Sequence, residues 1–301
     1  MSETYKVEKE YHNARFDRWF KQKILNLPQS LLEKLIRKNR IKVNNKKTKT
    51  SYRVQIGDEI EFFNTNNLKE ISRSAKEKYK ASNKEKDLYD DFIIEDNKDF
   101  LIINKPSGIP VQSGTKSFKN IIDILKDTKY FLNTKPYIVH RLDKDTSGVL
   151  IIAKTREYAQ LFTSLFRIRK IHKTYIAIAQ GEVSNKIKKM EDDLIIYEKN
   201  KKIIQKAVSN IKVIKKNINF SLIELNPITG RKHQLRKQLY NIGNPIVGDD
   251  KYYIKKFNKI NNKNNFLMLH AYKIKFMINN IKYNFKAKYN NKFEDFVKKN
   301  F

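Results

Sequence analysis

Residues 140–148 read His-Arg-Leu-Asp-Lys-Asp-Thr-Ser-Gly and combine two carboxylates, a histidine, two cations and a turn glycine. Apolar segments at 136–139 and 149–153 flank the stretch, so it is expected to be a loop between two strands. Side chains of these types can serve as acid, base, nucleophile, metal ligand or turn former. Which role applies depends on the other polar groups that the fold brings to this loop.

Five further polar clusters stand where predicted strands end. They lie at 104–108, 172–175, 229–236, 248–249 and 269–271. The candidate metal ligands are His140, His172, His233, His270 and Asp143. A metal site is disfavoured, because the sequence contains no His-x-x-x-His pair and the cations around these residues would repel a metal ion. No metal is therefore expected.

The two carboxylates of the opening stretch differ in their expected roles. Asp145 precedes Thr-Ser-Gly, a turn sequence in which its side chain would accept hydrogen bonds from nearby backbone N–H groups. A glycosidase needs two carboxylates roughly 5–10 Å apart around one bond, and the sequence does not establish such a distance. The cations around Asp143 favour an ionised carboxylate instead, so nucleophilic catalysis is a third possibility.

Residues 140–154 resemble the signature of the pseudouridine synthases that modify large-subunit ribosomal RNA, the C/D type. The other five clusters match that family in the same order, with Tyr252 following the cluster at 248–249. The matched region runs from about residue 92 to about residue 290.

The resemblance implies roles for individual residues. Asp143 matches the catalytic aspartate, Tyr175 the tyrosine that stacks on the target uracil, and Arg236 the basic residue that pairs with the aspartate. Arg141 matches an arginine that contacts RNA and can fill the gap left by a flipped nucleotide. Further RNA contacts are expected from Lys105, Lys173, Arg231 and His233. The family needs no cofactor. One departure is Gln238, where many relatives carry histidine.

The N-terminal region is strongly basic. Residues 15–53 contain thirteen Lys or Arg and two acidic residues, a local charge of +11. Apolar spacing predicts helices over 15–25 and from Pro28 to Asn39, followed by a short strand at 40–43 and a turn at Asn44-Asn45. Residues 54–62 alternate in part like an edge strand. This order resembles the S4 RNA-binding domain, in which the contacts would come from Arg15, Arg18, Arg37, Lys38, Arg40 and Lys42.

The remaining segments predict the fold class. Residues 71–90 are expected to be a polar linker between an S4-like domain at 14–70 and a catalytic domain at 91–301. The catalytic part is predicted to contain hairpins over 92–104 and 276–285, strands at 175–179 and 220–225, and helices over 157–167 and 233–240. Many strands with few helices indicate an α+β fold with a mixed or antiparallel sheet, preceded by a small α/β domain.

Composition narrows the class of protein. The chain has 301 residues, no cysteine and a net charge of +32, so thiolate chemistry and disulfides are excluded and a polyanionic partner is favoured. We expect a cytoplasmic monomer, not associated with a membrane, that isomerises specific uridines in large-subunit ribosomal RNA. Two alternatives remain open, namely a non-catalytic RNA-binding or ribosome-assembly factor and a hydrolase such as a nucleosidase.

Overall fold

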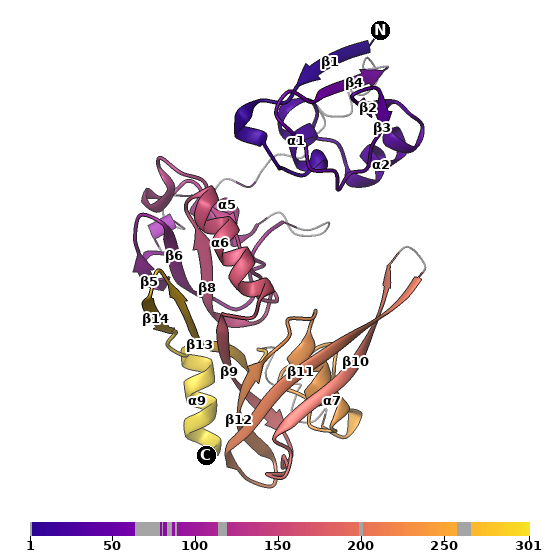
Figure 1. Ribbon diagram of the computed structural model, residues 1–301. Coiled ribbons are helices and arrows are strands. Elements are labelled where there is room, and N and C mark those ends of the chain that lie inside the picture. The colour runs from indigo at the N-terminus through magenta and orange to yellow at the C-terminus, as the bar shows by residue number, and fades with distance from the viewer. Residues whose placement is uncertain are drawn as a thin grey trace. The chain divides into compact units, whose positions relative to one another are not determined.

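The computed structural model describes residues 2–63, 79, 81–82, 86–87, 89–113, 119–198, 201–257 and 266–301. The chain divides into two compact units, Met1–Glu77 and Lys78–Phe301 (Figure 1). Most of the segment 71–90, expected to be a linker, lies outside the described residues. Within it, Ala81 and Tyr89 are buried in the core of the second unit, so this end of the segment is part of that unit.

The first unit packs two helices against a four-stranded antiparallel sheet. Its elements are β1 (Ser2–Lys6), η1 (Lys9–Tyr11), α1 (Phe16–Lys23), α2 (Gln29–Arg37), β2 (Ile41–Val43), β3 (Lys46–Lys47) and β4 (Glu59–Phe63). Both predicted helices are confirmed, because their periodic apolar residues form the core: Trp19 and Leu32 are almost fully buried, and the Phe20 ring packs edge-on against Phe62 of β4.

The edge-strand prediction for residues 54–62 is wrong. The strand β4 begins only at Glu59, and it lies inside the sheet, whose order is β1-β4-β2-β3. The missing neighbour is β1, which pairs with β4 along its whole length from Ser2 to Lys6. No residue of β1 is fully buried, so this strand gave no hydrophobic pattern from which it could be predicted.

Asparagines form the tight turns of both units. Asn44-Asn45 and Asn279-Asn280 are the two-residue turns of hairpins, and all four residues have positive φ, as the right-handed strand twist favours. The predicted hairpin over 276–285 is therefore confirmed. Asn39, with φ of 56°, ends α2 in the left-handed conformation.

The second unit is built on one ten-stranded sheet (Figure 1). Its strands are β5 (Ile93–Asp96), β6 (Phe100–Lys105), β7 (Tyr137–Ile138), β8 (Ser147–Ala153), β9 (His172–Gln180), β10 (Lys189–Glu198), β11 (Lys201–Lys216), β12 (Phe220–Pro227), β13 (Leu269–Ile278) and β14 (Ile281–Lys286). The order is β10-β11-β12-β9-β13-β8-β6-β5, with β14 beside β13 and β7 beside β8. Among the described strands only β8 and β13 pair in parallel, which confirms a mixed sheet.

Helices cover parts of this sheet and fill its cores. They are α5 (Ile121–Leu125), α6 (Arg156–Arg167), α7 (Gln234–Asn241) and α9 (Asn291–Asn300), with short 3-10 helices η2 (Asp90–Phe92), η3 (Lys129–Phe131) and η4 (Lys255–Phe257). Both predicted helices are confirmed; Phe162 of α6 is fully buried, and the Thr155 hydroxyl accepts a hydrogen bond from the N–H of Tyr158. No helix in the described part of the chain is long and apolar enough to cross a membrane.

Gly148 allows the parallel pair to form. A Cβ atom at this position would lie 2.2 Å from the backbone oxygen of Ala271, and the residue has φ of +112°. Both facts require glycine, since any side chain would push β8 away from β13. This contact fixes the start of β8, and with it the end of the loop that contains residues 140–146.

The hairpin of β10 and β11 extends beyond the rest of the sheet (Figure 1). The strand β11 has sixteen residues, but only Ser209 and later residues pair with β12, whereas residues 201–208 pair with β10 alone. We call this hairpin the β10–β11 arm. At its base, α7 packs on one face, and residues of the other face line a surface hollow.

Candidate active site

Four segments distant in sequence enclose a cleft of about 740 Å³ in the second unit. They are the loop 138–146 between β7 and β8, the end of α6 with residues 166–171, the side chains of Lys173 and Tyr175 on β9, and residues 227–236 between β12 and α7. Cations outnumber acidic groups in the lining: Arg141, Arg167, Arg169, Lys173, Arg231 and Arg236. Asp143 is the one carboxylate among the described lining residues, so the cleft suits an anionic ligand that meets a single acidic group.

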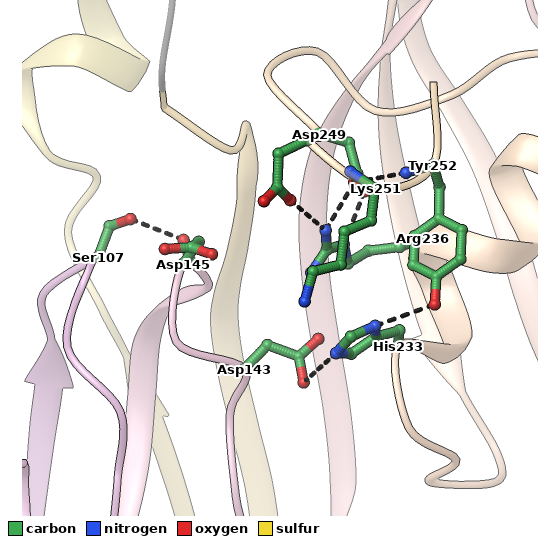
Figure 2. Close-up of polar contacts among 9 residues, drawn as sticks. Ser107, Asp143, Asp145, His233, Arg236, Asp249, Lys251 and Tyr252 are labelled. Carbon is green, nitrogen blue, oxygen red and sulfur yellow. Dashed lines mark hydrogen bonds and ion pairs between the residues drawn. The ribbon is translucent and has the colours of Figure 1, made fainter. Parts of the chain in front are cut away.

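The loop that carries Asp143 is anchored by hydrogen bonds from Ser107 and Lys105 and by a bond within the loop. The Thr146 N–H donates to the Asp143 carbonyl in a turn, and the Ser107 hydroxyl donates to the Asp145 carbonyl at 2.7 Å (Figure 2). The Lys105 ammonium donates to three carbonyls, those of Pro106, Ile109 and Lys144, at 2.7, 2.9 and 3.0 Å. These bonds hold the backbone at Asp143 and at the three residues that follow it.

The expected RNA contact of Lys105 is corrected by this arrangement. The side chain is completely buried, and its three N–H groups are directed to the backbone. Burial lowers the pKa of Lys105 to about 7, while Asp145 and Asp143 act in the opposite direction. Lys105 therefore supports the loop and does not reach a ligand in the cleft.

Two histidines of the polar clusters have structural surroundings. The Nε2 atom of His140 accepts a hydrogen bond from the Ile151 N–H at 2.9 Å, so this ring is neutral, and burial lowers its pKa to about 3. His270 is buried between the Ser147 hydroxyl and the Ala287 carbonyl, and burial lowers its pKa to about 4. His140 lines the cleft with its Nε2 occupied by a backbone N–H, and His270 is not among the residues that line the cleft.

His233 is the group that faces Asp143. Its Nε2 lies 3.8 Å from Asp143 Oδ1, and its Nδ1 is 3.0 Å from the Tyr252 hydroxyl (Figure 2). Burial lowers the pKa of His233; Asp143 acts in the opposite direction, and Arg236 with two neighbouring lysines reinforces the lowering. The imidazole is thus held neutral beside the carboxylate. We expected His233 to contact RNA, but its proximity to Asp143 was not predicted.

The expected ion pair between Arg236 and Asp143 is replaced by a different one. Arg236 binds Asp249 through two hydrogen bonds of 2.6 Å, and Asp250 at 3.1 Å (Figure 2). Asp249 also accepts bonds from the N–H groups of Lys251 and Tyr252. Burial alone would lower the pKa of Arg236, but Asp249 raises it above its usual value, with Asp143 contributing. Arg236 therefore supplies a fixed positive charge near Asp143, but its direct partner is Asp249.

Tyr175 lines the cleft from the middle of the sheet, as expected of an aromatic platform. Burial raises its pKa well above the usual value, and the negative charge of Asp143 adds to this effect. The phenol consequently stays protonated at neutral pH. Its ring is half-buried, which fixes its orientation while one side remains part of the cleft lining.

The chain matches known proteins over most of its length. A family model described as RNA pseudouridylate synthase matches residues 99–241, and one described as S4 domain matches residues 15–60. Ribosomal large subunit pseudouridine synthase C of Buchnera aphidicola subsp. Baizongia pistaciae is 34% identical over 273 residues, which are 87% of this chain and 85% of the relative. The chain belongs to the RNA pseudouridylate synthase family. Members of this family are isomerases.

Two further pseudouridine synthases agree with this assignment. The protein of the same name from Haemophilus influenzae is 30% identical over 283 residues, covering 90% of this chain and 85% of the relative. The solved structure of human RNA pseudouridylate synthase domain containing 4 is 26% identical with a TM-score of 0.57, covering 69% of this chain and 92% of that one. The resemblance recognised in the polar clusters is thereby confirmed, together with the N-terminal S4 domain.

Gln238, a departure from the common pseudouridine synthase pattern, is explained by packing. Its side chain is fully buried, accepts a hydrogen bond from the Ser209 hydroxyl at 2.7 Å, and donates to the carbonyls of Met190 and Ala207 at 3.2 Å. These bonds tie α7 to β10 and β11. The residue therefore positions the helix that carries Arg236 and makes no contact with the cleft.

The basic residues predicted in the S4 domain have different surroundings. Arg15 forms a two-bond ion pair with Asp17 at 2.7 and 3.1 Å, so its guanidinium already has a partner. The Lys42 ammonium lies over the Phe63 ring at 5.5 Å. The other four predicted side chains are exposed to solvent: Arg18, Arg37, Lys38 and Arg40.

Arg167 and Arg169 are cleft residues that were not predicted. Both stand in the sequence Arg167-Ile-Arg-Lys at the end of α6, where a basic run is common simply because cations stabilise the C-terminus of a helix. Only the tertiary fold, which brings this end of α6 opposite residues 227–231, distinguishes them from ordinary surface cations.

Proposed function

We propose that this protein converts specific uridines to pseudouridine in large-subunit ribosomal RNA, with Asp143 as the reacting carboxylate. The observation that carries the proposal is the isolation of Asp143: among the described residues that line the cleft, it is the one acidic residue beside six cationic ones. Such a surface attracts a polyanion and leaves one carboxyl group facing it. The names of the relatives in Buchnera and Haemophilus support ribosomal RNA as the polyanion.

The reaction requires only what these side chains supply. The N1–C1′ bond of uridine breaks, the uracil turns, and C5 bonds to C1′; a proton leaves C5 and N1 regains one, so no electron is gained or lost. Asp143 assists by attack at C1′, by attack at C6, or by promoting elimination across the ribose. Arg236 supplies a fixed positive charge near Asp143, and the His233 ring, whose Nε2 lies 3.8 Å from Asp143 Oδ1, limits the orientations that the carboxylate can take.

Reaching the base has a cost that the cleft offsets. Extruding a nucleotide from folded RNA costs a few kcal/mol, and stacking on an aromatic ring returns about 1–3 kcal/mol. We assign this stacking to Tyr175, which lines the cleft, and we assign the vacated position in the RNA to Arg141, which is exposed and stands two residues before Asp143 in the chain. Lys173 and Arg231, at the cleft wall, are assigned to flanking phosphates.

Pseudouridine mapping in cells tests this function. In large-subunit ribosomal RNA from cells that lack the protein, carbodiimide-based mapping should show one or a few positions lost. The wild-type gene should restore them and Asp143→Ala should not. If every position persists, the substrate is wrong; if the Ala variant restores them, the protein acts as a non-catalytic factor. Release of free uracil instead of an isomer of equal mass would indicate a hydrolase.

The S4 domain is expected to contribute to binding and not to chemistry. Replacing Arg37, Lys38 and Arg40 together with alanine should reduce the slope of log K against log salt by about 2–3, since each lost phosphate contact removes roughly 0.7–0.9. The rate at saturating RNA should stay unchanged. Lys23→Ala is the control, because this ammonium already lies 2.8 Å from Glu8 and 3.3 Å from Glu10. Equal slopes for the triple variant and wild type would refute the assignment.

A further inference from the structure

Left-handed backbone conformations mark two unusual residues in the described part of the chain. Eight non-glycine residues there have positive φ, and six of them are asparagines, the residue type that best tolerates this conformation. The two exceptions are Arg169, with φ of 60°, and His233, with φ of 53°. Both line the cleft. His233 is explained by its place beside Asp143, whereas Arg169 has no role in the chemistry proposed above.

Arg169 occupies a position where glycine would be favoured. It is the second residue after α6, following the C-cap residue Ile168. Its N–H donates to the Phe166 carbonyl, and the N–H of Lys170 donates to the Leu165 carbonyl, which is the pattern of a helix end closed by a left-handed residue. Asn39 closes α2 in the same way, with equivalent bonds to Ile36 and Leu35. An arginine in this conformation is strained, whereas glycine would not be. Unlike glycine, however, it presents a charged side chain, which is exposed.

The side chain of Arg169 lies between the cleft and a second hollow of about 270 Å³. Three residues line both spaces: Arg169, Thr229 and Arg231. The second hollow is completed by residues from the base of the β10–β11 arm, namely Lys189, Glu191, Lys206 and Val208. The two hollows are therefore neighbours, with these three residues between them.

The second hollow has a positive net charge, and several of its cations are held by neighbouring groups. Its lining contains four cations and one acid. Glu191 holds two of these cations, Lys189 by an ion pair and Lys206 at 3.3 Å. The Nε of Arg231 donates to the Lys206 carbonyl at 3.2 Å, which fixes its guanidinium against β11. Planar guanidinium groups held in this manner suit phosphate oxygens, which they can bind through two parallel hydrogen bonds.

We propose that the second hollow binds backbone phosphate of the RNA strand next to the target uridine, with Arg169 and Arg231 guiding the strand out of the cleft. The proposal rests on the proposed function, because it takes RNA as the ligand of the cleft. It explains why a strained arginine replaces glycine or asparagine at the end of α6, and why the β10–β11 arm carries cations at the face that meets Arg231.

Arg169→Gly separates this role from a structural one, because it removes the charge and relieves the strain together. With a transcript of large-subunit ribosomal RNA as probe, the slope of log K against log salt should fall by about 0.7–0.9, and binding near 0.15 M salt should weaken about fivefold. The unfolding midpoint should stay the same or rise. Arg169→Lys should keep most of the slope.

Lys282→Ala provides the matched control, since Lys282 is exposed on β14, a strand that contributes to neither hollow. It should leave the slope at the wild-type value. An unchanged slope for Arg169→Gly overturns the proposal, whatever the midpoint does. Pseudouridine formation by wild type on the same transcript is scored separately, so a failure of the proposed function would appear there and not in the slopes.

Discussion

Replacing Asp143 with asparagine is expected to abolish pseudouridine formation, with a fall in the single-turnover rate on the order of 10⁴-fold or more, equivalent to about 5.5 kcal/mol. Asparagine has nearly the same shape but is neither a nucleophile nor a base at neutral pH. The other described residues lining the cleft contain no second carboxylate to take over. RNA affinity should not fall, because the change removes a negative charge from a surface that binds a polyanion.

Asp145→Asn is the matched control for this experiment. Asp145 stands two residues away on the same loop but does not line the cleft, and Ser107 binds its backbone carbonyl rather than its side chain. Its substitution should change the rate only slightly. A quenched-flow assay on a transcript that contains the mapped uridine measures both variants. An Asp143→Asn enzyme as fast as wild type, or an Asp145→Asn enzyme as slow as Asp143→Asn, would contradict the assigned roles.

Asp249→Ala is expected to destabilise the second unit by about 3–5 kcal/mol, because it leaves the Arg236 guanidinium charged and buried without its main partner. The side chains of Arg236 and Asp249 are 3% and 0% exposed, so water cannot replace the lost carboxylate. Two backbone N–H groups, those of Lys251 and Tyr252, would lose their acceptor as well. The orientation of Arg236 near Asp143 should be lost together with this stability.

Asp250→Ala tests whether burial is the cause. Asp250 binds the same guanidinium at 3.1 Å, but its side chain is 68% exposed, so its removal should cost no more than about 1 kcal/mol. Urea unfolding followed by circular dichroism reports on both units, while the single tryptophan, Trp19, reports on the first unit alone. Asp249→Ala should therefore shift the transition of the second unit and leave that of Trp19 in place. Equal costs for Asp249→Ala and Asp250→Ala would show that burial does not strengthen the pair.

Sequence patterns were sufficient for several of the regular elements and for the family. Periodic apolar residues predicted α1, α2 and α6, and the Asn279-Asn280 pair predicted the hairpin between β13 and β14; all are confirmed. Local signals suffice in these cases, because helix faces and tight turns are specified by residues close together in the chain. The strand β1 was missed because it lacks such a local signal: no residue of it is fully buried, so its sequence shows no hydrophobic alternation.

What the sequence by itself determined is the set of polar clusters that assemble around Asp143 and the basic character of the chain. Only the tertiary structure decided how those residues pair: Arg236 with Asp249, Lys105 with three carbonyls, and Arg169 with the hollow beside β11. The physical reason is that pairing and burial depend on distances between segments far apart in the chain. A lysine or arginine has the same charge in the sequence whether the fold buries it beneath a loop or presents it to RNA.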